Sequence, residues 1–264
     1  FYSISMEAIG YIFEDVRQYY NPNKEVVTKM DEYGNFFERV ILVDNSDTEI
    51  KGLCNNDKIT YIPLKKNHGI AYALNIGVNM AKELNFEWVM TLDQDSVMTE
   101  GCVIQLTNTI NSCDDSKIAM VCGNYEPDKY PSASGVTDIH FAITSGTVLK
   151  MSAFEEIGPF VNELFIDAVD YEYCYRAVSK GYTILRDNRA IFHHVVGNPT
   201  YVKGIKCRNY PPFRYYYITR NNLIVSKMYG KVLPESMELR EHIKKYRKAA
   251  WYEANKYYKQ FLKV

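Results

Sequence analysis

The sequence lacks the features of a membrane span and of several common cofactor sites. No stretch of its 264 residues approaches 18 consecutive apolar residues, so we expect no membrane-spanning helix. The six cysteines form no C-x-x-C pair, and several lie in apolar runs, which indicates reduced core residues of a cytoplasmic protein. No P-loop and no G-x-G-x-x-G motif follows a strand-like run, which argues against P-loop nucleoside triphosphatases and dinucleotide-dependent oxidoreductases. No signal peptide is recognisable either, although the first residue is Phe1 and not Met, which leaves room for an upstream segment.

The net charge of −1 hides an uneven distribution of charge along the chain. Residues 201–264 hold 15 Lys+Arg and 4 Asp+Glu, a balance of +11, whereas the first 200 residues hold 16 and 28, a balance of −12. Apolar residues recur at helical spacing in the last part of this basic segment, namely Leu239, Ile243, Tyr246, Ala250, Ala254, Tyr257 and Phe261. We therefore predict one domain at 1–230 and a basic amphipathic helix at 231–264. That helix either lies on an anionic membrane or packs against the acidic body of the chain.

Short apolar runs alternate with helical patterns in the first half of the chain. Strands are predicted at Ala8–Phe13, Val40–Val43, Ile59–Ile62, Trp88–Leu92 and Ile118–Cys122. Helices are predicted from Asn21-Pro22 to about Gly34, over Gly69–Leu84, near Glu100–Ile110 and over Pro211–Tyr229. This alternation predicts an α/β fold with a doubly wound, mostly parallel sheet flanked by helices.

Two of the predicted strands lead directly into acidic residues, Val43 into Asp44 and Leu92 into Asp93. In open α/β sheets, ligands bind at the carboxyl ends of the strands, so both acids are predicted to face one crevice. Asp93 and Asp95 are two residues apart and therefore point to the same side of an extended strand. Two carboxylates on one side suit a hard divalent cation such as Mg²⁺ or Mn²⁺, although a polar turn after a buried strand explains the same residues.

Six short motifs occur in an order that resembles a known family. They are Tyr20-Asn21-Pro22, Val43-Asp44-Asn45-Ser46, Asn67-His68-Gly69-Ile70-Ala71-Tyr72-Ala73-Leu74-Asn75, Leu92-Asp93-Gln94-Asp95-Ser96, Phe165-Ile166-Asp167-Ala168-Val169-Asp170-Tyr171-Glu172 and Arg220-Asn221. From about Tyr20 to Tyr229 the chain resembles the family 2 inverting glycosyltransferases, and among them most the bacterial rhamnosyltransferases of cell-surface polysaccharide synthesis. The resemblance implies a glycosyltransferase A fold, a nucleotide-diphospho-sugar donor and a divalent cation, Mg²⁺ or Mn²⁺.

The resemblance also implies roles for residues on the donor side. Asp44 matches the residue that contacts the nucleobase or ribose of the donor, with Asn45 beside it. Asn67 and Gly69 match a segment that supports the donor, although a simple helix start explains them equally well. The pair Arg220-Asn221 matches a basic position that approaches the diphosphate, although an arginine in a Tyr-rich helix also suits stacking on aromatic rings.

On the metal side, Asp93 and Asp95 match the D-x-D pair that holds the cation and the donor diphosphate. His194, or else its neighbour His193, matches a further metal or phosphate contact. Both histidines lie in an apolar, strand-like run, and strand alternation predicts that one faces the core and the other the cleft.

Asp170 falls where the family places its catalytic base, the carboxylate that takes a proton from the acceptor hydroxyl during displacement at the anomeric carbon. Asp167 and Glu172 are rival carboxylates within about one helical turn of it. The dipole at a helix N-terminus is a further explanation for an acidic residue at this position.

We therefore expect a metal-dependent inverting glycosyltransferase that moves a sugar, with rhamnose from dTDP-rhamnose as the first candidate, to a hydroxyl of a saccharide or lipid-linked saccharide. Such a reaction belongs to bacterial cell-wall or capsule polysaccharide synthesis, in the cytoplasm or at the inner face of the plasma membrane, without nucleic acid. A sugar nucleotidyltransferase and a non-catalytic carbohydrate-binding protein of the same fold are the alternatives. The nucleotidyltransferase would need a Gly-rich, Arg-containing loop after the first strand, and the sequence shows none.

Overall fold

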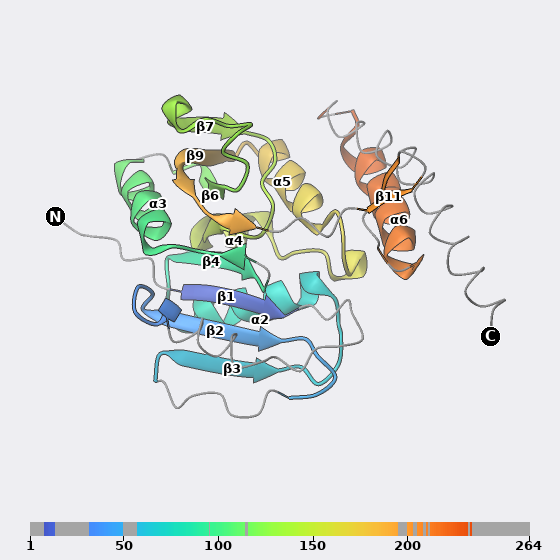
Figure 1. Cartoon of the computed structure of the whole chain (residues 1–264), viewed down its shortest axis with the longest axis horizontal. Helices are drawn as coiled ribbons and strands as arrows, with labels where there is room; N and C mark the ends of the chain where they lie inside the picture. Colours follow the sequence, from blue (N-terminus) through green and yellow to red (C-terminus); the bar gives the residue numbers. More distant parts are fainter. Residues whose placement is uncertain are drawn as a thin grey trace.

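Eight strands form one mixed sheet, with helices packed against it (Figure 1). The computed structural model describes residues 8–13, 32–49, 57–94, 96–113, 116–194, 200–202, 205–207, 210, 212–231 and 233. The strand order is β3-β2-β1-β4-β8-β6-β9-β7. The strands are β1 Ala8–Phe13, β2 Arg39–Asp44, β3 Ile59–Pro63, β4 Trp88–Asp93, β6 Ile118–Asn124, β7 Val136–Ile139, β8 Thr147–Lys150 and β9 Thr183–Ile191.

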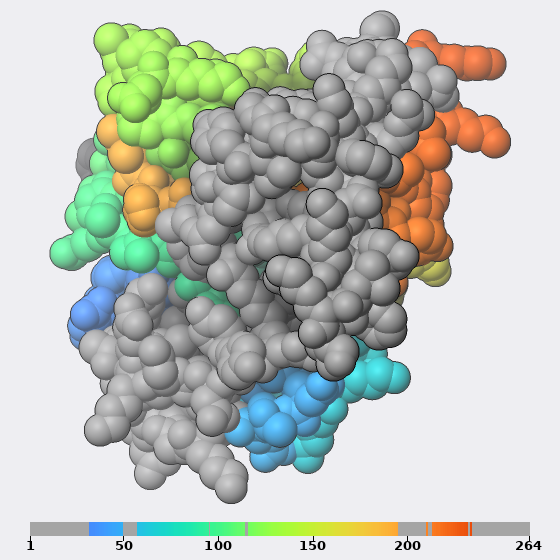
Figure 2. All heavy atoms as spheres, turned by 45° about the vertical axis from the view of Figure 1, so that its right-hand side comes forward, coloured from blue at the N-terminus to red at the C-terminus, as the bar shows by residue number. Residues whose placement is uncertain are grey.

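Helices cover both faces of this sheet. They are α2 Ile70–Glu83, α3 Glu100–Ser112, α4 Met151–Ile157, α5 Val169–Ser179 and α6 Pro212–Tyr229, with short 3-10 turns η1 Ser132–Ser134 and η2 Asn162–Leu164. Helices α2, α4 and α5 pack on one face, and α3 packs on the other. Helix α6 lies beside α5 on the side away from the sheet (Figure 1). In the space-filling view, α6 forms one edge of the molecule, with the segment around β7 at the top and β2 and β3 at the bottom (Figure 2).

The two faces of the sheet are built from alternating residues of the same strands. In β2, Val40 and Leu42 join the core under α3, whereas Ile41 and Val43 join the core under α2, α4 and α5. All four side chains are fully buried. A strand with apolar residues on both faces reads as a continuous hydrophobic run, which is why this strand is recognisable from the sequence.

The prediction of an α/β fold with helices on both faces of the sheet is confirmed, and four of the seven strand pairs are parallel. The sheet is nevertheless mixed, because β8 runs antiparallel between β4 and β6, and β7 runs antiparallel to β9. These two strands have four residues each and lie in the irregular stretch after β6, so they carry too few residues for a periodic signal.

Most predicted elements of the first half agree with the structure to within one or two residues. The helix predicted to begin at Asn21-Pro22 lies almost wholly outside the described residues, and so does the helix predicted at 231–264. Two small ribbons complete the described chain, namely β5 Ser96–Val97 with β10 His193–His194 and β11 Thr200–Val202 with β12 Ile205–Cys207. Among the helices that the structure describes, none combines the length and the apolar character that crossing a bilayer requires.

Candidate active site

The acidic ends of β2 and β4 lie at one edge of the sheet. Both strands pair in parallel with β1, where Asp44 is opposite Phe13 and Asp93 is opposite Ile12. One strand separates the two acids, which corresponds to about 10 Å across the sheet. The predicted crevice at the carboxyl ends of the strands is therefore where the candidate residues of β2 and β4 meet.

Asp93 is held at this edge by a chain of hydroxyl groups. Its backbone N–H donates to Ser145 Oγ at 3.0 Å, and Ser145 Oγ lies 2.6 Å from Ser96 Oγ. Ser96 Oγ in turn lies 2.7 Å from Nδ1 of His194, because β5 pairs antiparallel with β10 and brings these two residues opposite each other. The structure thus connects Asp93 with His194 through two buried serines. Asp95, the second acid of the pair, lies outside the described residues.

The two histidines differ in exposure, and the prediction that one of them faces the core is wrong. His193 is exposed and His194 is half-buried. The reason is that β10 is a two-residue ribbon strand paired with β5 at the rim of the main sheet, not a strand inside that sheet. His194 is the one on the site side, where its ring meets the ring of Tyr125 edge-on at 5.6 Å.

Asp170 lies in the first turn of α5 and is half-buried. Burial of its carboxyl raises the pKa of Asp170 to about 7, the hydrogen bond from the Tyr171 N–H lowers it, and the nearby charges of Asp167 and Asp93 raise it further. The contribution of Asp93 to this pKa indicates that the strand-end acid lies near enough to Asp170 for their charges to interact. A carboxyl that titrates near neutral pH is suited to accept a proton in a reaction at that pH.

The two rival carboxylates have structural partners. Asp167 forms a two-pronged ion pair with Arg214, with both N–O distances at 3.2 Å. Glu172 is buried, where it accepts hydrogen bonds from Arg176 at 2.9 Å and from the Tyr229 hydroxyl at 2.7 Å. Asp167 and Glu172 are thus engaged in ion pairs, whereas Asp170 Oδ1 accepts the Tyr171 N–H at 2.9 Å.

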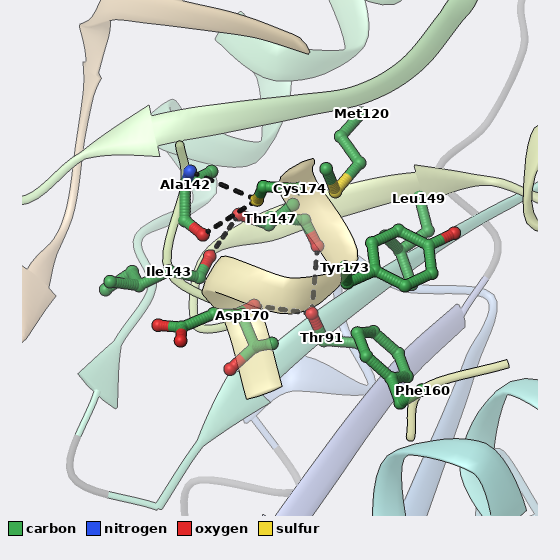
Figure 3. Close-up of a pocket in the computed structure, with 11 residues that line it drawn as sticks. Thr91, Met120, Ala142, Ile143, Thr147, Leu149, Phe160, Asp170, Tyr173 and Cys174 are labelled. Atoms are coloured by element: carbon green, nitrogen blue, oxygen red, sulfur yellow. Dashed lines mark hydrogen bonds between the residues drawn. The ribbon is translucent and has the colours of Figure 1, made fainter. Parts of the chain in front are cut away.

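A small cavity of about 10 Å³, with room for roughly one water molecule, lies behind Asp170 (Figure 3). Its other walls are mainly apolar side chains and backbone, from Thr91, Met120, Ala142, Ile143, Thr144, Thr147, Leu149, Phe160, Tyr173 and Cys174. Two contacts fasten the wall at 142–144, since Cys174 Sγ meets the Ala142 backbone at 3.4 Å and the Thr91 hydroxyl donates to the Thr144 carbonyl. This rigid, largely apolar wall explains why the anionic form of Asp170 is disfavoured.

At the end of β2, Asp44 and Asn45 are almost fully buried and organise the loop around them. Asp44 accepts hydrogen bonds from the Ser46 N–H at 3.0 Å, from the Ser46 hydroxyl and from the Tyr61 hydroxyl at 2.7 Å. The Asn45 amide donates to Asn67 Oδ1 at 3.2 Å. These contacts join the end of β2 to β3 and to the segment before α2, and the predicted contact of Asp44 and Asn45 with the donor stays a prediction.

Asn67 and Gly69 form the start of α2. Both residues lie directly before the first residue of α2, Ile70, and Asn67 Oδ1 accepts the Gly69 N–H at 2.9 Å. Their contact with the donor stays a prediction. Gly69 has a left-handed φ of +84°, and a Cβ there would lie 2.6 Å from the ring of Phe165. Only glycine fits both the backbone conformation and the close approach of that ring.

Arg220 and Asn221 were predicted to contact the donor, and the structure gives Asn221 a different role. Asn221 is fully buried, and its amide nitrogen donates to the carbonyls of Leu164, Ile166 and Asp167 at 2.7–2.8 Å. The prediction of a donor contact is therefore wrong for Asn221. Arg220 shows the alternative behaviour, because its guanidinium stands 4.7 Å from the Tyr217 ring centre and donates to the Leu164 carbonyl at 3.2 Å.

Sequence reasoning missed Tyr125 as a residue of this site. Its ring meets His194 at 5.6 Å and Phe192 at 6.0 Å. Burial, followed by the charges of Glu126 and Asp170, raises the pKa of the Tyr125 hydroxyl above its usual range. Tyr125 directly follows β6, and its place at the carboxyl end of a buried strand is the signal that would have identified it.

Known proteins with similar sequences are glycosyltransferases. Residues 24–147 match the model of Glycosyl transferase family 2. The dTDP-rhamnosyl transferase RfbF of Shigella flexneri is 29% identical over 233 residues, which are 78% of this chain and 77% of that protein. These matches identify the chain as a glycosyltransferase that is similar to family 2. It is also 26% identical over 162 residues to the low-salt glycan biosynthesis hexosyltransferase Agl10 of Haloferax volcanii, across 53% of each chain.

Solved structures with the glycosyltransferase A fold resemble this glycosyltransferase. A crystal structure of GalNAc-T7 with UDP, GalNAc and Mn²⁺ matches with a TM-score of 0.58 at 12% identity, over 91% of this chain and 55% of that one. The structure of residues 1–349 of S. aureus TarS matches with a TM-score of 0.52 at 12% identity, over 84% of this chain and 66% of that one. The predicted glycosyltransferase A fold is therefore confirmed, and the chain spans about half to two thirds of these two structures.

Proposed function

We propose that this glycosyltransferase is inverting and metal-dependent and transfers rhamnose from dTDP-rhamnose to a hydroxyl of a saccharide or lipid-linked saccharide in the synthesis of a bacterial cell-wall or capsule polysaccharide. The relative named as a dTDP-rhamnosyl transferase supports the choice of donor. The observation that carries the mechanism is the half-buried carboxyl of Asp170, whose pKa of about 7 depends in part on Asp93 at the same edge of the sheet.

In the proposed reaction, Asp170 accepts the proton of the acceptor hydroxyl as that oxygen attacks the anomeric carbon. A carbon–oxygen bond to the acceptor forms while the bond to the diphosphate breaks, and the attack from the opposite side inverts the anomeric centre. A base with a pKa near the working pH is efficient in this role, and such general base catalysis contributes about 10²–10⁴-fold.

Asp93 and His194 are the described residues that would hold a divalent cation, together with Asp95 of the sequence motif. Their carboxylate and imidazole donors fit Mn²⁺ or Mg²⁺. The contact between Ser96 and His194 Nδ1 has the form in which a hydrogen bond on one ring nitrogen orients a histidine for coordination through the other. No cluster of three His, Cys, Asp or Glu able to hold a metal occurs within the described residues, which exclude Asp95. A bound cation would neutralise charge on the departing nucleoside diphosphate.

A thermal-shift panel of thymidine, uridine and guanosine diphosphates, each with and without Mn²⁺, tests this proposal. A ligand at 100 times its Kd stabilises the folded protein by about 2.7 kcal/mol. We expect the largest rise in melting temperature with thymidine diphosphate and Mn²⁺ together. Asp93→Asn should remove the part of this temperature rise that depends on Mn²⁺, whereas Asp128→Asn, at an exposed position, should leave it unchanged. If none of the three diphosphates raises the melting temperature, the proposal fails.

We further propose a peripheral membrane contact at the inner face of the plasma membrane through the basic segment 231–264. The lysine-rich pattern of that segment supports the idea, although nearly all of it lies outside the described residues. Co-sedimentation with vesicles of anionic phosphatidylglycerol should retain the full chain, and vesicles of neutral phosphatidylcholine should not. A chain in which Lys244, Lys245, Arg247 and Lys248 are all changed to Gln should bind less. Equal binding by the wild-type chain and this variant would contradict the proposed membrane contact.

A further inference from the structure

Residues 164–168 form the joint that leads from η2 into α5 and end two residues before Asp170. Three of the five residues have a positive φ although they carry side chains, namely 64° at Phe165, 64° at Asp167 and 60° at Ala168. A positive φ is unfavourable for residues with a Cβ, so a joint of this kind persists only where its surroundings enforce it.

Contacts from helix α6 stabilise this backbone conformation from one side. The buried amide nitrogen of Asn221 donates to the carbonyls of Leu164, Ile166 and Asp167, at 2.7, 2.8 and 2.8 Å. The two N–H groups of this amide thereby serve three backbone carbonyls of the joint, with one hydrogen shared between two of them. No apolar residue of similar size would satisfy those buried acceptors.

Arg214 of α6 adds a second contact with the joint. Its Nε and Nη2 each donate to one carboxylate oxygen of Asp167, at 3.2 Å, and its guanidinium stacks over the ring of Tyr210 at 4.1 Å. The pair is largely withdrawn from solvent, with side-chain exposures of 23% for Arg214 and 19% for Asp167. The two-pronged geometry fixes the direction of the Asp167 side chain, which a single contact to a lysine would not do.

The other side of the joint contacts the starts of two helices. The Phe165 carbonyl accepts the Ile70 N–H of α2 at 2.7 Å, and the Phe165 ring occupies the space beside Gly69. The Ala168 carbonyl accepts the Glu172 N–H at 3.0 Å in the first turn of α5. The joint therefore connects α6 with the donor-side start of α2 and with the turn that carries Asp170.

We propose that Asn221 and Arg214 are positioning residues, through which α6 holds the joint 164–168 and so sets the place of Asp170 against the donor side of the cleft. The role rests on the proposed function of Asp170 as base and requires no contact between α6 and the donor. A displacement of about 1 Å in a catalytic group is enough to lower a rate by about 10²-fold, so a loosened joint acts on catalysis before it acts on binding.

The test compares the joint variants Asn221→Ala and Arg214→Gln with the control Lys227→Gln. Like Arg214→Gln, the control removes one positive charge from α6, but at an exposed position. The turnover is the release of thymidine diphosphate from dTDP-rhamnose with Mn²⁺ and water as acceptor. We expect both joint variants to lower kcat by about 10–100-fold while the donor KM changes by less than about threefold. Arg214→Lys should recover part of the loss, and Lys227→Gln should match the wild-type chain.

Amide hydrogen exchange gives a second readout that does not depend on activity. Exchange at Ile70, Ile166 and Glu172 should rise at least about tenfold in both joint variants while the amides of β4 keep their protection. A raised donor KM with unchanged kcat, or exchange that rises equally throughout the sheet, would overturn the positioning role. If the wild-type chain itself does not turn over dTDP-rhamnose, the proposed function has failed, and the exchange at Glu172 still decides whether α6 holds the joint.

Discussion

Replacing Asp170 by Asn should stabilise the protein at alkaline pH while it removes activity. The substitution keeps the shape of the side chain and removes its ability to ionise. In the folded protein, burial and the charges of Asp167 and Asp93 raise the pKa of Asp170 to about 7, from 3.8. The folded protein therefore disfavours an anion that the unfolded chain solvates freely, and Asn avoids this penalty.

The size and sign of the effect follow from linkage. Each unit of difference in pKa corresponds to 1.36 kcal/mol, so a carboxyl that titrates near 7 destabilises the folded state by up to about 4 kcal/mol at alkaline pH. Between pH 3.8 and about 7 the folded state keeps the proton that the unfolded state has lost, so this contribution to stability decreases as pH rises through that window. We expect the free energy of unfolding of Asp170→Asn to exceed that of the wild-type chain by about 2–4 kcal/mol at pH 8, and by clearly less at pH 5.

Urea unfolding of both chains at pH 5 and pH 8, in buffer with EDTA, measures this difference. The chelator is needed because a bound cation would favour the anion. In a chain of this size, each kcal/mol corresponds to about 2–4 °C in melting temperature, so thermal melts provide a check. Asp128→Asn serves as the control at an exposed aspartate. A variant that differs from wild type equally at both pH values, or that is less stable at pH 8, would refute the reasoning.

Three further predictions follow from the site. Ser145→Ala removes the acceptor of the Asp93 N–H and should weaken Mn²⁺ binding by about 10–100-fold in a metal titration, and unchanged affinity would argue against the hydroxyl chain. Gly69→Ala introduces a Cβ into a ring at a left-handed φ and should cost at least about 2 kcal/mol by urea unfolding, so wild-type stability would contradict the packing. Asp167→Asn removes a charge that raises the pKa of Asp170, so the acidic limb of the pH–rate profile should move to lower pH, and a shift to higher pH would oppose this assignment.

The first half of the fold is predictable because its strands are buried on both faces and its helices are amphipathic. Val40–Val43 and Trp88–Leu92 read as continuous apolar runs, and both occur as central strands. The antiparallel strand Thr147–Lys150 gives no such signal, since its four residues become a strand through pairing with Trp88–Thr91 and with Met120–Cys122. Pairing between residues so far apart in sequence is a tertiary effect that local patterns do not contain.

The candidate site is likewise predictable only where local sequence position determines where a side chain lies. The acids at strand ends are predictable because position on a strand determines where a side chain lies, and Asp44 and Asp93 are at the expected edge. The motif does not state in which direction a helix residue points, so Asn221 was assigned to the donor although it faces the joint before α5. The hydrogen bonds of Ser96 with Ser145 and with His194 were not predicted, because they join residues 49 and 98 positions apart in the chain.

The release of thymidine diphosphate from dTDP-rhamnose tests the central claim most directly. Wild-type protein with Mn²⁺ should release the diphosphate, and EDTA should stop the release. Asp170→Asn should be at least about 10²-fold slower while it binds the donor as tightly as wild type. Release by Asp170→Asn at the wild-type rate would contradict the account, because no base at this position would then take part in the transfer.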